Sequence, residues 1–305
     1  MYRVVMSRLV VAVLVAVTVA VIGFSLLRLS GDLAAELAGD GATPSEIESA
    51  RTKHGLDRPL PVQFARWSVD LASGDLGRSL FSGEPVADMI LTRLPVTLQL
   101  AVYALLVSIL LGIPLGMIAA MHPRSWIDRL SLVTAVLGQA VPSFWLALVL
   151  IVVFGVMLRW TPISGSDTAV HFILPTVTLA ASSLPGLMRL TRSGMLDALA
   201  TDYVRTARAK GLAERTLVAV HALPNALLPV LALAAVQLGT LLGGSVIVES
   251  VFALDGIGLL AYRSILRGDF PVVQSLLILV ALAYTALTLL ADIANAIIDP
   301  RIRLG

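Results

Sequence analysis

Six uncharged, apolar stretches recur along the chain, over residues 9–27, 94–123, 130–158, 168–188, 216–248 and 270–291. The shortest has 19 residues. About 20 residues of helix cross the roughly 30 Å hydrocarbon core of a bilayer. Because lipid offers no hydrogen-bond partner to the backbone, such stretches are expected to be helical. We therefore predict six membrane-spanning helices, with tilt, kinks or interfacial turns in the longer second, third and fifth stretches.

The first stretch, which follows Arg3 and Arg8, also has the layout of a signal peptide. Its apolar run is longer than the usual core of about 7–15 residues, and no A-x-A cleavage pattern follows it. We interpret residues 1–29 as a retained first helix. Residues 30–93 then form an extracytoplasmic loop subdomain, and residues 94–305 form a core with five further spanning helices.

Composition supports a membrane protein. Charged residues make up 14% of the chain and hydrophobic residues 57%, whereas soluble domains carry roughly 25% charged residues. The mean hydropathy is +0.91. The sequence has no cysteine, which excludes disulfides, thiolate nucleophiles and cysteine-ligated metals.

Positive charges predict the orientation. With six spans, both ends of the chain lie on one side of the membrane. Assigning the ends, residues 121–129 and residues 189–215 to the cytoplasm places twelve Lys and Arg side chains there and three in the short opposite loops. The long loop 28–93 is not counted, because long loops cross largely regardless of charge. We therefore predict that both termini are cytoplasmic.

The loop subdomain 30–93 has two helical patterns, at 46–53 and 62–71, separated by glycine and prolines. We interpret it as a small ordered cap on the outer face with Trp67 packed inside it. Direct contact with a substrate is the alternative.

Small residues and prolines mark positions inside the apolar stretches. Gly112 and Gly116 form a G-x-x-x-G pair, and Gly239 and Gly243 form another. Small residues at this spacing allow helices to pack closely in lipid. Pro142 removes a backbone donor and predicts a kink or the edge of a span.

The sequence offers little enzymatic chemistry. It lacks a Walker A phosphate loop, an H-E-x-x-H motif and a G-x-S-x-G motif, and its four histidines are scattered. Among acidic residues near the spans, Asp292 comes closest to a proton-relay position, and we interpret it as a terminal cap or ion pair. These features argue against ATP hydrolysis by this chain, a metal site, a membrane-embedded enzyme and an ion-driven carrier.

The predicted cytoplasmic loop 195–224 is patterned rather than merely polar. Gly211 is expected to end a helix through a positive φ, and a second helix resumes by Thr216 and enters the membrane near Pro224. A helix–glycine–helix elbow could be gripped by another protein, or could lie on anionic lipid. An amphipathic stripe precedes the glycine, formed by Leu196, Leu199, Tyr203 and Ala207.

This loop resembles the EAA loop of binding-protein-dependent ABC importer permeases, which reads E-A-A, three residues, G, nine residues, I-x-L-P. Here the pattern is R-T-A at 205–207, then Gly211, then H-A-L-P at 221–224. The third position, the glycine and the Leu-Pro match, whereas the first two positions and the Ile position depart. The stretch YVRTARAKGL at 203–212 is similar to the peptide/nickel subfamily of these permeases.

Further segments resemble that subfamily in the same order along the chain. They are GLDRPL at 55–60, GDLGRS at 74–79, VPSFWL at 141–146, ILP at 173–175, LTRS at 190–193, VESVF at 248–252, GIG at 256–258, DFPVVQ at 269–274 and DPR at 299–301.

The resemblance implies an all-α permease with the type I ABC importer fold, multi-pass in the bacterial inner membrane. It implies a subunit that imports di- or oligopeptides; nickel or another small solute is the alternative, and an ion-coupled carrier is a more distant one. The implied partners are a second homologous permease subunit, two cytoplasmic ABC ATPase subunits or domains, an extracytoplasmic solute-binding protein and membrane lipid, with no nucleic acid. ATP and Mg²⁺ would be used by the ATPases, and no cofactor would bind this chain.

Two sets of candidate site residues follow. The resemblance implies that the elbow contacts an ATPase through Arg205, Thr206, Ala207, Arg208, Gly211, Leu223 and Pro224. Ala207 and Gly211 would suit close approach to the partner. Polar or aromatic groups near the spans are candidates for the substrate pathway, and packing is the alternative role for each: Gln139, Ser143, Trp145, Ser182, Ser183, Gln237 and Glu249. Because nickel prefers His, Cys or carboxylate ligands, of which this set has few, the set favours peptides.

Overall fold

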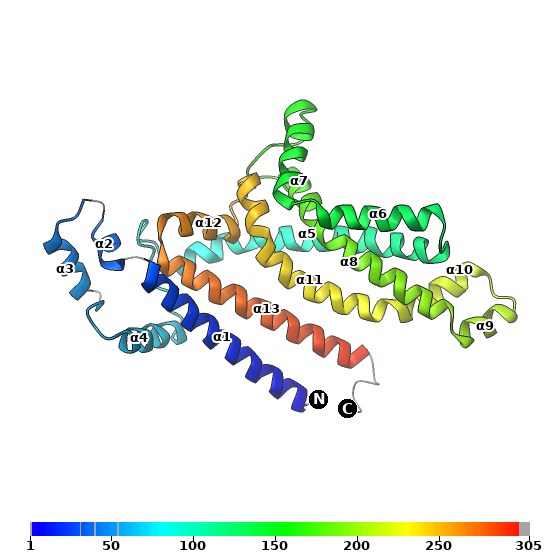
Figure 1. Cartoon of the computed structure of the whole chain (residues 1–305), viewed down its shortest axis with the longest axis horizontal. Helices are drawn as coiled ribbons and strands as arrows, with labels where there is room; N and C mark the ends of the chain where they lie inside the picture. Colours follow the sequence, from blue (N-terminus) through cyan, green and yellow to red (C-terminus); the bar gives the residue numbers. More distant parts are fainter. Residues whose placement is uncertain (1, 31, 40, 54, 299–305) are drawn as a thin grey trace.

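The computed structural model describes residues 2–30, 32–39, 41–53 and 55–298. Five long helices form the main body of the molecule (Figure 1). They are α1 (Tyr2–Ser30), α5 (Val86–Met121), α8 (Ile173–Leu199), α11 (Leu223–Phe252) and α13 (Phe270–Ile298). Helix α8 packs between α5 and α11, α13 packs on α11, and α1 lies along α13. The fold is therefore the all-α bundle that the apolar stretches predict.

Four helical segments of the described chain are long and apolar enough to cross a membrane: Val86–Met121, Ala169–Leu199, Glu214–Phe252 and Phe270–Leu290. The pair Trp126–Ala140 and Ser143–Met157 is a fifth if it counts as one broken span, and Val10–Ser25 is a shorter apolar helix. The spans expected from the sequence thus have helical counterparts, and the count of six stays a prediction.

The third apolar stretch turns sharply instead of forming one straight helix. Helix α6 (Trp126–Ala140) ends before Pro142, and α7 (Ser143–Leu150) continues into a π-helical turn, η1 (Ile151–Met157), at 99° to α6. Val141 is extended, with φ −78° and ψ 123°, because the ring of a following proline disfavours helical backbone. The kink predicted at Pro142 is confirmed. The segment α7–η1 projects from the bundle (Figure 1), and we call it the α7 arm.

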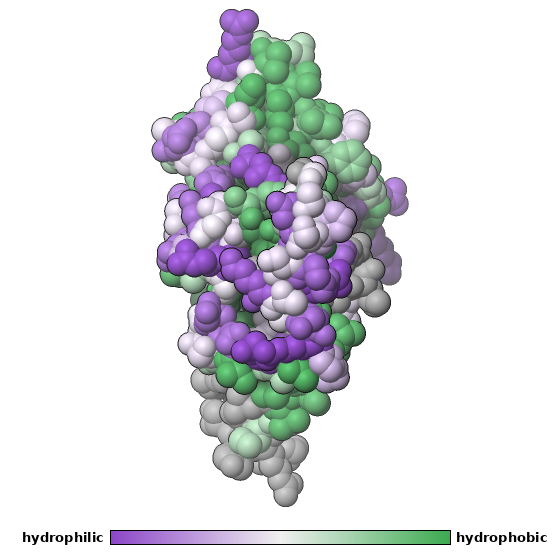
Figure 2. Space-filling model, turned by 90° about the vertical axis from the view of Figure 1, so that its left-hand side faces the viewer, coloured by the Kyte–Doolittle hydropathy of each residue, from purple (hydrophilic) through white to green (hydrophobic). Residues whose placement is uncertain are grey.

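The loop between the first two long helices contains α2 (Leu33–Ala38), α3 (Pro44–Lys53) and α4 (Leu60–Ala72), so the two helical patterns predicted there are confirmed. Helix α4 is attached to α1 by aromatic packing. The Phe24 ring lies 5.3 Å from that of Phe64 and 5.7 Å from that of Trp67. Hydrophilic side chains gather on this end of the molecule, whereas the α7 arm above it is largely apolar (Figure 2).

The opposite end carries the segment between α8 and α11 (Figure 1). It consists of α9 (Asp202–Ala209), a single turn α10 (Glu214–Thr216) and a π-helical turn η3 (Leu217–Ala222) that leads into α11. Two further short elements lie elsewhere: η2 (Ala169–Phe172) precedes α8, and α12 (Ile257–Arg267) connects α11 to α13. The side chain of Asp292 and the segment 299–301 lie outside the described residues.

Candidate functional site

The elbow, residues 195–224, is held together by a small internal cluster. Val204 and Ala207 of α9 are buried against Leu217, with Leu199 at the edge. The prediction that Leu196 to Ala207 form one stripe on a single helix is wrong. The helix breaks after Leu199, and the new start at Thr201, which is extended, turns α9 so that Val204 faces inward. Tyr203, a member of that stripe, is 43% exposed, whereas Ala207 is buried.

Gly211 ends the first half of the elbow as the sequence predicts. Its φ is +79°, a left-handed conformation that glycine adopts without strain. A Cβ placed there would meet no atom within 4 Å. Across this turn Arg208 donates two hydrogen bonds to Glu214, Nε to Oε1 at 2.6 Å and Nη2 to Oε2 at 3.2 Å. The bidentate contact raises the pKa of Arg208 and closes the turn.

The predicted contact residues of the elbow divide between its outside and its inside. Arg205 and Thr206 are exposed, and their polar contacts are local: Arg205 pairs with Asp202 at 3.0 Å, and the Thr206 hydroxyl donates to the Asp202 carbonyl. Ala207 is 7% exposed. Its small side chain faces the interior of the elbow, and its contact with a partner stays a prediction.

Leu223 and Pro224 mark the transition from the elbow into α11. Leu223 packs against the cluster that joins the ends of α5 and α8. Pro224 is the second residue of α11 and is exposed. Inside an α-helix its ring would clash with the carbonyl of the residue four positions before it. The wider π-helical turn η3 stands directly before Leu223 and gives that ring room.

A buried ion pair that sequence reasoning missed connects α6 to α8 near the elbow. Arg192 donates Nε to Asp128 Oδ1 at 2.6 Å and Nη2 to Asp128 Oδ2 at 2.8 Å. Asp128 is 3% exposed and also accepts the Arg124 backbone N–H at 2.9 Å. A second contact joins the same two helices: Arg189 of α8 donates to the amide oxygen of Gln139 of α6 at 2.8 Å. The sequence signal was weak, since Asp128 reads as an ordinary residue in the first turn of a helix.

The structure does not gather the pathway candidates into one site. Gln139 is on α6, Ser143 and Trp145 are on the α7 arm, and the other four belong to α8 or α11. Their role in a pathway stays a prediction.

Four of the candidates join helices, and one of them is Gln139, which accepts the hydrogen bond from Arg189 of α8. The Ser183 hydroxyl lies 2.6 Å from that of Ser108 on α5, and the Gln237 amide of α11 donates to the Ser183 carbonyl at 2.9 Å. Glu249 is fully buried and bonds Thr97 of α5. Two others present surface to the outside of the chain: Trp145 is 51% exposed, and Ser182 is exposed.

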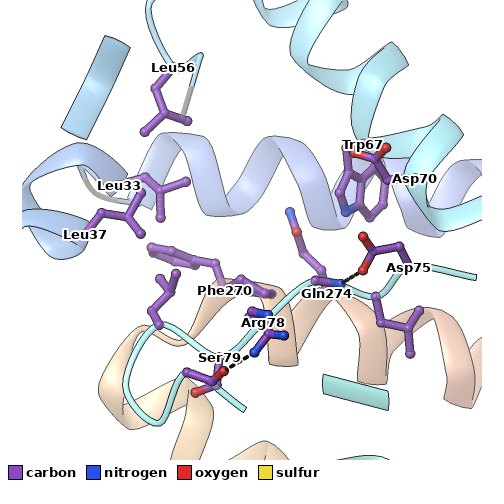
Figure 3. A pocket seen from close by; sticks show the side chains of 15 residues that line it. Leu33, Leu37, Leu56, Trp67, Asp70, Asp75, Arg78, Ser79, Phe270 and Gln274 are labelled. Carbon is purple, nitrogen blue, oxygen red and sulfur yellow. Dashed lines mark hydrogen bonds between the residues drawn. The ribbon is translucent and has the colours of Figure 1, made fainter. Parts of the chain in front are cut away.

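A cavity of about 570 Å³ opens at the end that carries α2–α4. Leu33 and Leu37 of α2, Trp67 of α4, and Phe270 and Gln274 of α13 line it, together with the turn that follows α4 (Figure 3).

The base of this cavity is fixed by one carboxylate. The Ser79 hydroxyl donates to Asp269 Oδ2 at 2.5 Å, and the Leu80 N–H donates to Asp269 Oδ1 at 3.1 Å. Two motif segments, 74–79 and 269–274, are therefore in contact although they are far apart in the sequence.

Comparison with known proteins gives matches along nearly the whole chain. Residues 112–304 match the family model described as "Binding-protein-dependent transport system inner membrane component". Residues 1–101 match the model described as "Binding-prot-dependent transport system membrane comp, N-term".

Two curated relatives and one solved structure illustrate the similarity. A putative peptide transport system permease protein of Brucella abortus (strain 2308) is 40% identical over 99% of both chains. The glutathione transport system permease protein GsiC of Escherichia coli (strain K12) is 42% identical over 90% of both. A chain of the MetNI methionine ABC transporter, solved in inward-facing conformations, matches 71% of this chain and 99% of its own length with a TM-score of 0.60. At 21% sequence identity, this structural match shows a shared fold alone.

Proposed function

The chain belongs to the family of binding-protein-dependent transport system inner membrane components, and from this membership we propose that it imports peptides. It is a multi-pass inner-membrane permease subunit of an ABC importer rather than an enzyme, as the family resemblance implied. Relatives whose names specify peptides or glutathione support peptides as the cargo. No observation favours nickel or another small solute.

Membership of this family implies a complex with ATPase and binding-protein partners. In detail, we propose two cytoplasmic ATPase subunits or domains that use ATP and Mg²⁺, a second homologous permease subunit beside this one, and an extracytoplasmic solute-binding protein. The predicted orientation of the chain in the membrane assigns the ATPases and the binding protein to opposite ends of the molecule. The elbow meets the ATPase, and the end with α2–α4 and the cavity in Figure 3 meets the binding protein.

One observation carries the coupling role of the elbow. It ends the molecule opposite α2–α4, and it is closed by its own contacts, the Val204–Ala207–Leu217 cluster and the Arg208–Glu214 pair. Its outward surface, with Arg205 and Thr206, has no contact to the rest of the bundle among the interactions of the described residues. A rigid projection with a free polar face suits transmission of force from a docked protein.

The proposed docking face can be blocked without disturbing the interior of the elbow. Ala209 ends α9 and is exposed. We expect Ala209→Trp to abolish co-purification of the ATPase subunits and ATP-dependent peptide uptake by the reconstituted complex, because the indole occupies the contact surface. Ala65→Trp, at an exposed position of α4 on the other end, is the matched control and should retain ATPase binding. Equal ATPase recovery with both variants would show that the elbow is not the docking site.

For the pathway, we propose the candidates whose side chains are open to a passing peptide in this structure, Trp145 and Ser182. Gln139, Ser183, Gln237 and Glu249 make contacts between helices, and Ser143 starts the α7 arm. A neutral, weakly binding lining suits a conduit that must release what it carries.

A further inference from the structure

The start of α12 is held by side chains from two other helices. Glu249 of α11 accepts hydrogen bonds at Oε2 from the backbone N–H groups of Gly258, at 2.7 Å, and Leu259, at 3.1 Å. The Thr97 hydroxyl of α5 donates to Glu249 Oε1 at 2.8 Å and accepts the Ile257 N–H at 2.9 Å. The first three N–H groups of α12, which have no partner within their own helix, are all satisfied in this way.

Two glycines make this approach possible. A Cβ at Gly256 would lie 2.5 Å from Thr97 Oγ1 and would collide with the Glu249 carboxylate. A Cβ at Gly258 would lie 2.8 Å from Glu249 Oε2 and 2.7 Å from the Val246 Cα. The two glycines of the segment G-I-G at 256–258 thus leave room for the Glu249 carboxylate of V-E-S-V-F at 248–252. One contact therefore explains why both motifs occur in this chain.

This arrangement is more costly than a helix start requires. A Ser, Thr, Asp or Asn at the N-cap position would satisfy one of these N–H groups locally, but that position is Gly256, which has no side chain. Instead a carboxylate with 0% exposure is used, together with a hydroxyl that is also 0% exposed, although burying a carboxylate is unfavourable. What the distant groups add is a connection among α5, α11 and α12.

The connection fixes a helix that has one buried and one free face. Ile257 and Leu260 of α12 pack with Ile90 of α5 and with Val272 and Leu276 of α13. The opposite face is open, with a surface that includes Tyr262, Ile265 and Leu266. Figure 1 shows α12 beside the starts of α5 and α13, toward the end that carries α2–α4.

We propose that Thr97 and Glu249 are positioning residues that latch α12 to α5 and α11, so that α12 moves with these helices as an outer gate of the transport path. The proposal rests on the import function proposed above. Without the latch, the remaining attachments of α12 are its apolar face, Asp269 at its C-terminal end, and the partly exposed Arg93–Asp255 ion pair just before its start, which contributes little. Its open face then no longer keeps a fixed position relative to the spans, and ATP-driven motion of those spans is not transmitted to it.

The absence of cysteine from the sequence permits a direct test of the latch. Ser264 lies on the buried face of α12 and is 4% exposed, so the reactivity of Ser264→Cys reports whether that face separates from α5 and α13. Thr97→Val removes the hydroxyl at nearly constant volume, and Thr97→Ser keeps it. In the complete complex, we expect maleimide to label the double variant Ser264→Cys/Thr97→Val about tenfold faster than the double variant Ser264→Cys/Thr97→Ser. The reason is that in Thr97→Val the buried Glu249 carboxylate loses a hydrogen-bond donor, so α12 leaves its packed position more often. Ile265→Cys, at a position that is 62% exposed, should react rapidly in both backgrounds.

A transport measurement separates positioning from general instability. In proteoliposomes with the ATPases and the binding protein, Thr97→Val should lower peptide uptake about tenfold relative to Thr97→Ser and raise the ATP hydrolysed per peptide. A partly misfolded variant lowers uptake and hydrolysis together and leaves that ratio unchanged. Equal protection of Ser264→Cys in both backgrounds overturns the latch, and faster labelling with an unchanged ratio overturns its role in transport. Failure of the wild-type complex to import any tested peptide contradicts the proposed cargo instead, and the labelling comparison then decides the latch alone.

Discussion

At Gly116 the backbone of α5 approaches α8 so closely that a methyl group has no room. A Cβ there would lie 2.8 Å from the Thr191 Cβ and would collide with the Met188 carbonyl oxygen. Gly112, one turn earlier, is tight to a lesser degree, with the Leu187 Cβ at 3.3 Å. Without a hydrophobic driving force between helices in lipid, such close packing is a main source of helix association. The contact therefore makes a direct contribution to the stability of the bundle.

The two G-x-x-x-G pairs provide a matched test of this contribution. Gly116→Ala should destabilise the protein by about 1–3 kcal/mol, because the obstructing atoms include backbone that cannot rotate away. Gly243→Ala is the control, since a Cβ at Gly243 meets nothing within 4 Å, and it should have little effect. Thermal unfolding of the detergent-solubilised protein measures both changes. Equal melting temperatures for the two variants would contradict the packing role assigned to Gly116.

The residue scale also shows what sequence alone can and cannot predict. The spacing identified both glycine pairs as packing positions, but it could not say which has a neighbour within this chain. A Cβ at Gly239 would lie 2.8 Å from the Tyr284 ring, whereas a Cβ at Gly243 would meet no atom within 4 Å. In the same way Glu249 was recognised as a polar group near a span, yet its hydrogen-bond partners are residues 97, 258 and 259. Such partners are set by the tertiary fold, to which a single sequence gives no distance information.

At the scale of elements, helices α6 and α8 are joined by the Asp128–Arg192 pair at the side of the bundle that leads into the elbow. The pair is bidentate, and Asp128 is 3% exposed. Removal of one member of a buried pair leaves its partner without compensation, which is more costly than the pair itself is favourable. The side chain of Arg192 is 23% exposed, so water offsets part of this cost.

A double-mutant cycle tests whether this pair couples the two helices. Asp128→Ala and Arg192→Ala should each destabilise the protein, and the double variant should lose less than the sum, with a coupling energy of about 1–3 kcal/mol. Thermal unfolding in detergent provides the measurement. The Arg205→Ala and Asp202→Ala cycle is the control, because that pair is exposed within one turn of α9 and should show weak coupling. Additive losses at Asp128 and Arg192 would mean that the contact does not hold α6 to α8.

Element boundaries were predictable where a residue dictates backbone geometry. Gly211 and Pro142 marked real breaks, and the helical patterns at 46–53 and 62–71 correspond to α3 and α4. Prediction failed where the periodicity continued across a break. The spacing of Leu199 and Tyr203 suits one helix, but the chain turns between them at Ala200 and Thr201. The direction of the α7 arm was equally hidden, since an apolar stretch indicates an apolar environment and not the angle at which the helix lies.

On the scale of the whole molecule, the two ends that we propose to bind partners are separate structures connected by the long helices. The elbow is closed by its own cluster, and the other end is assembled from α2–α4, the turn after α4 and the starts of α12 and α13 (Figure 1). The Ser79–Asp269 contact is the clearest link between the loop segment and the helical core at that end. A change there should therefore affect events on the outer face and leave the elbow intact.

Ser79→Ala tests this separation. The Ser79 hydroxyl donates to Asp269 and accepts the N–H groups of Phe81 and Ser82, at 3.3 and 3.1 Å, so its loss frees the turn and leaves a buried carboxylate oxygen without that donor. We expect the affinity of the binding protein for the detergent-solubilised complex to fall by about 1–2 kcal/mol, roughly a tenfold higher Kd. ATPase co-purification should stay unchanged, the reverse of the result expected for Ala209→Trp. Ser73→Ala is the control, because that hydroxyl contacts only the Asp70 carbonyl within α4. Loss of ATPase binding in Ser79→Ala would show that the two ends are not independent, and an unchanged Kd would place the binding protein elsewhere on the outer face.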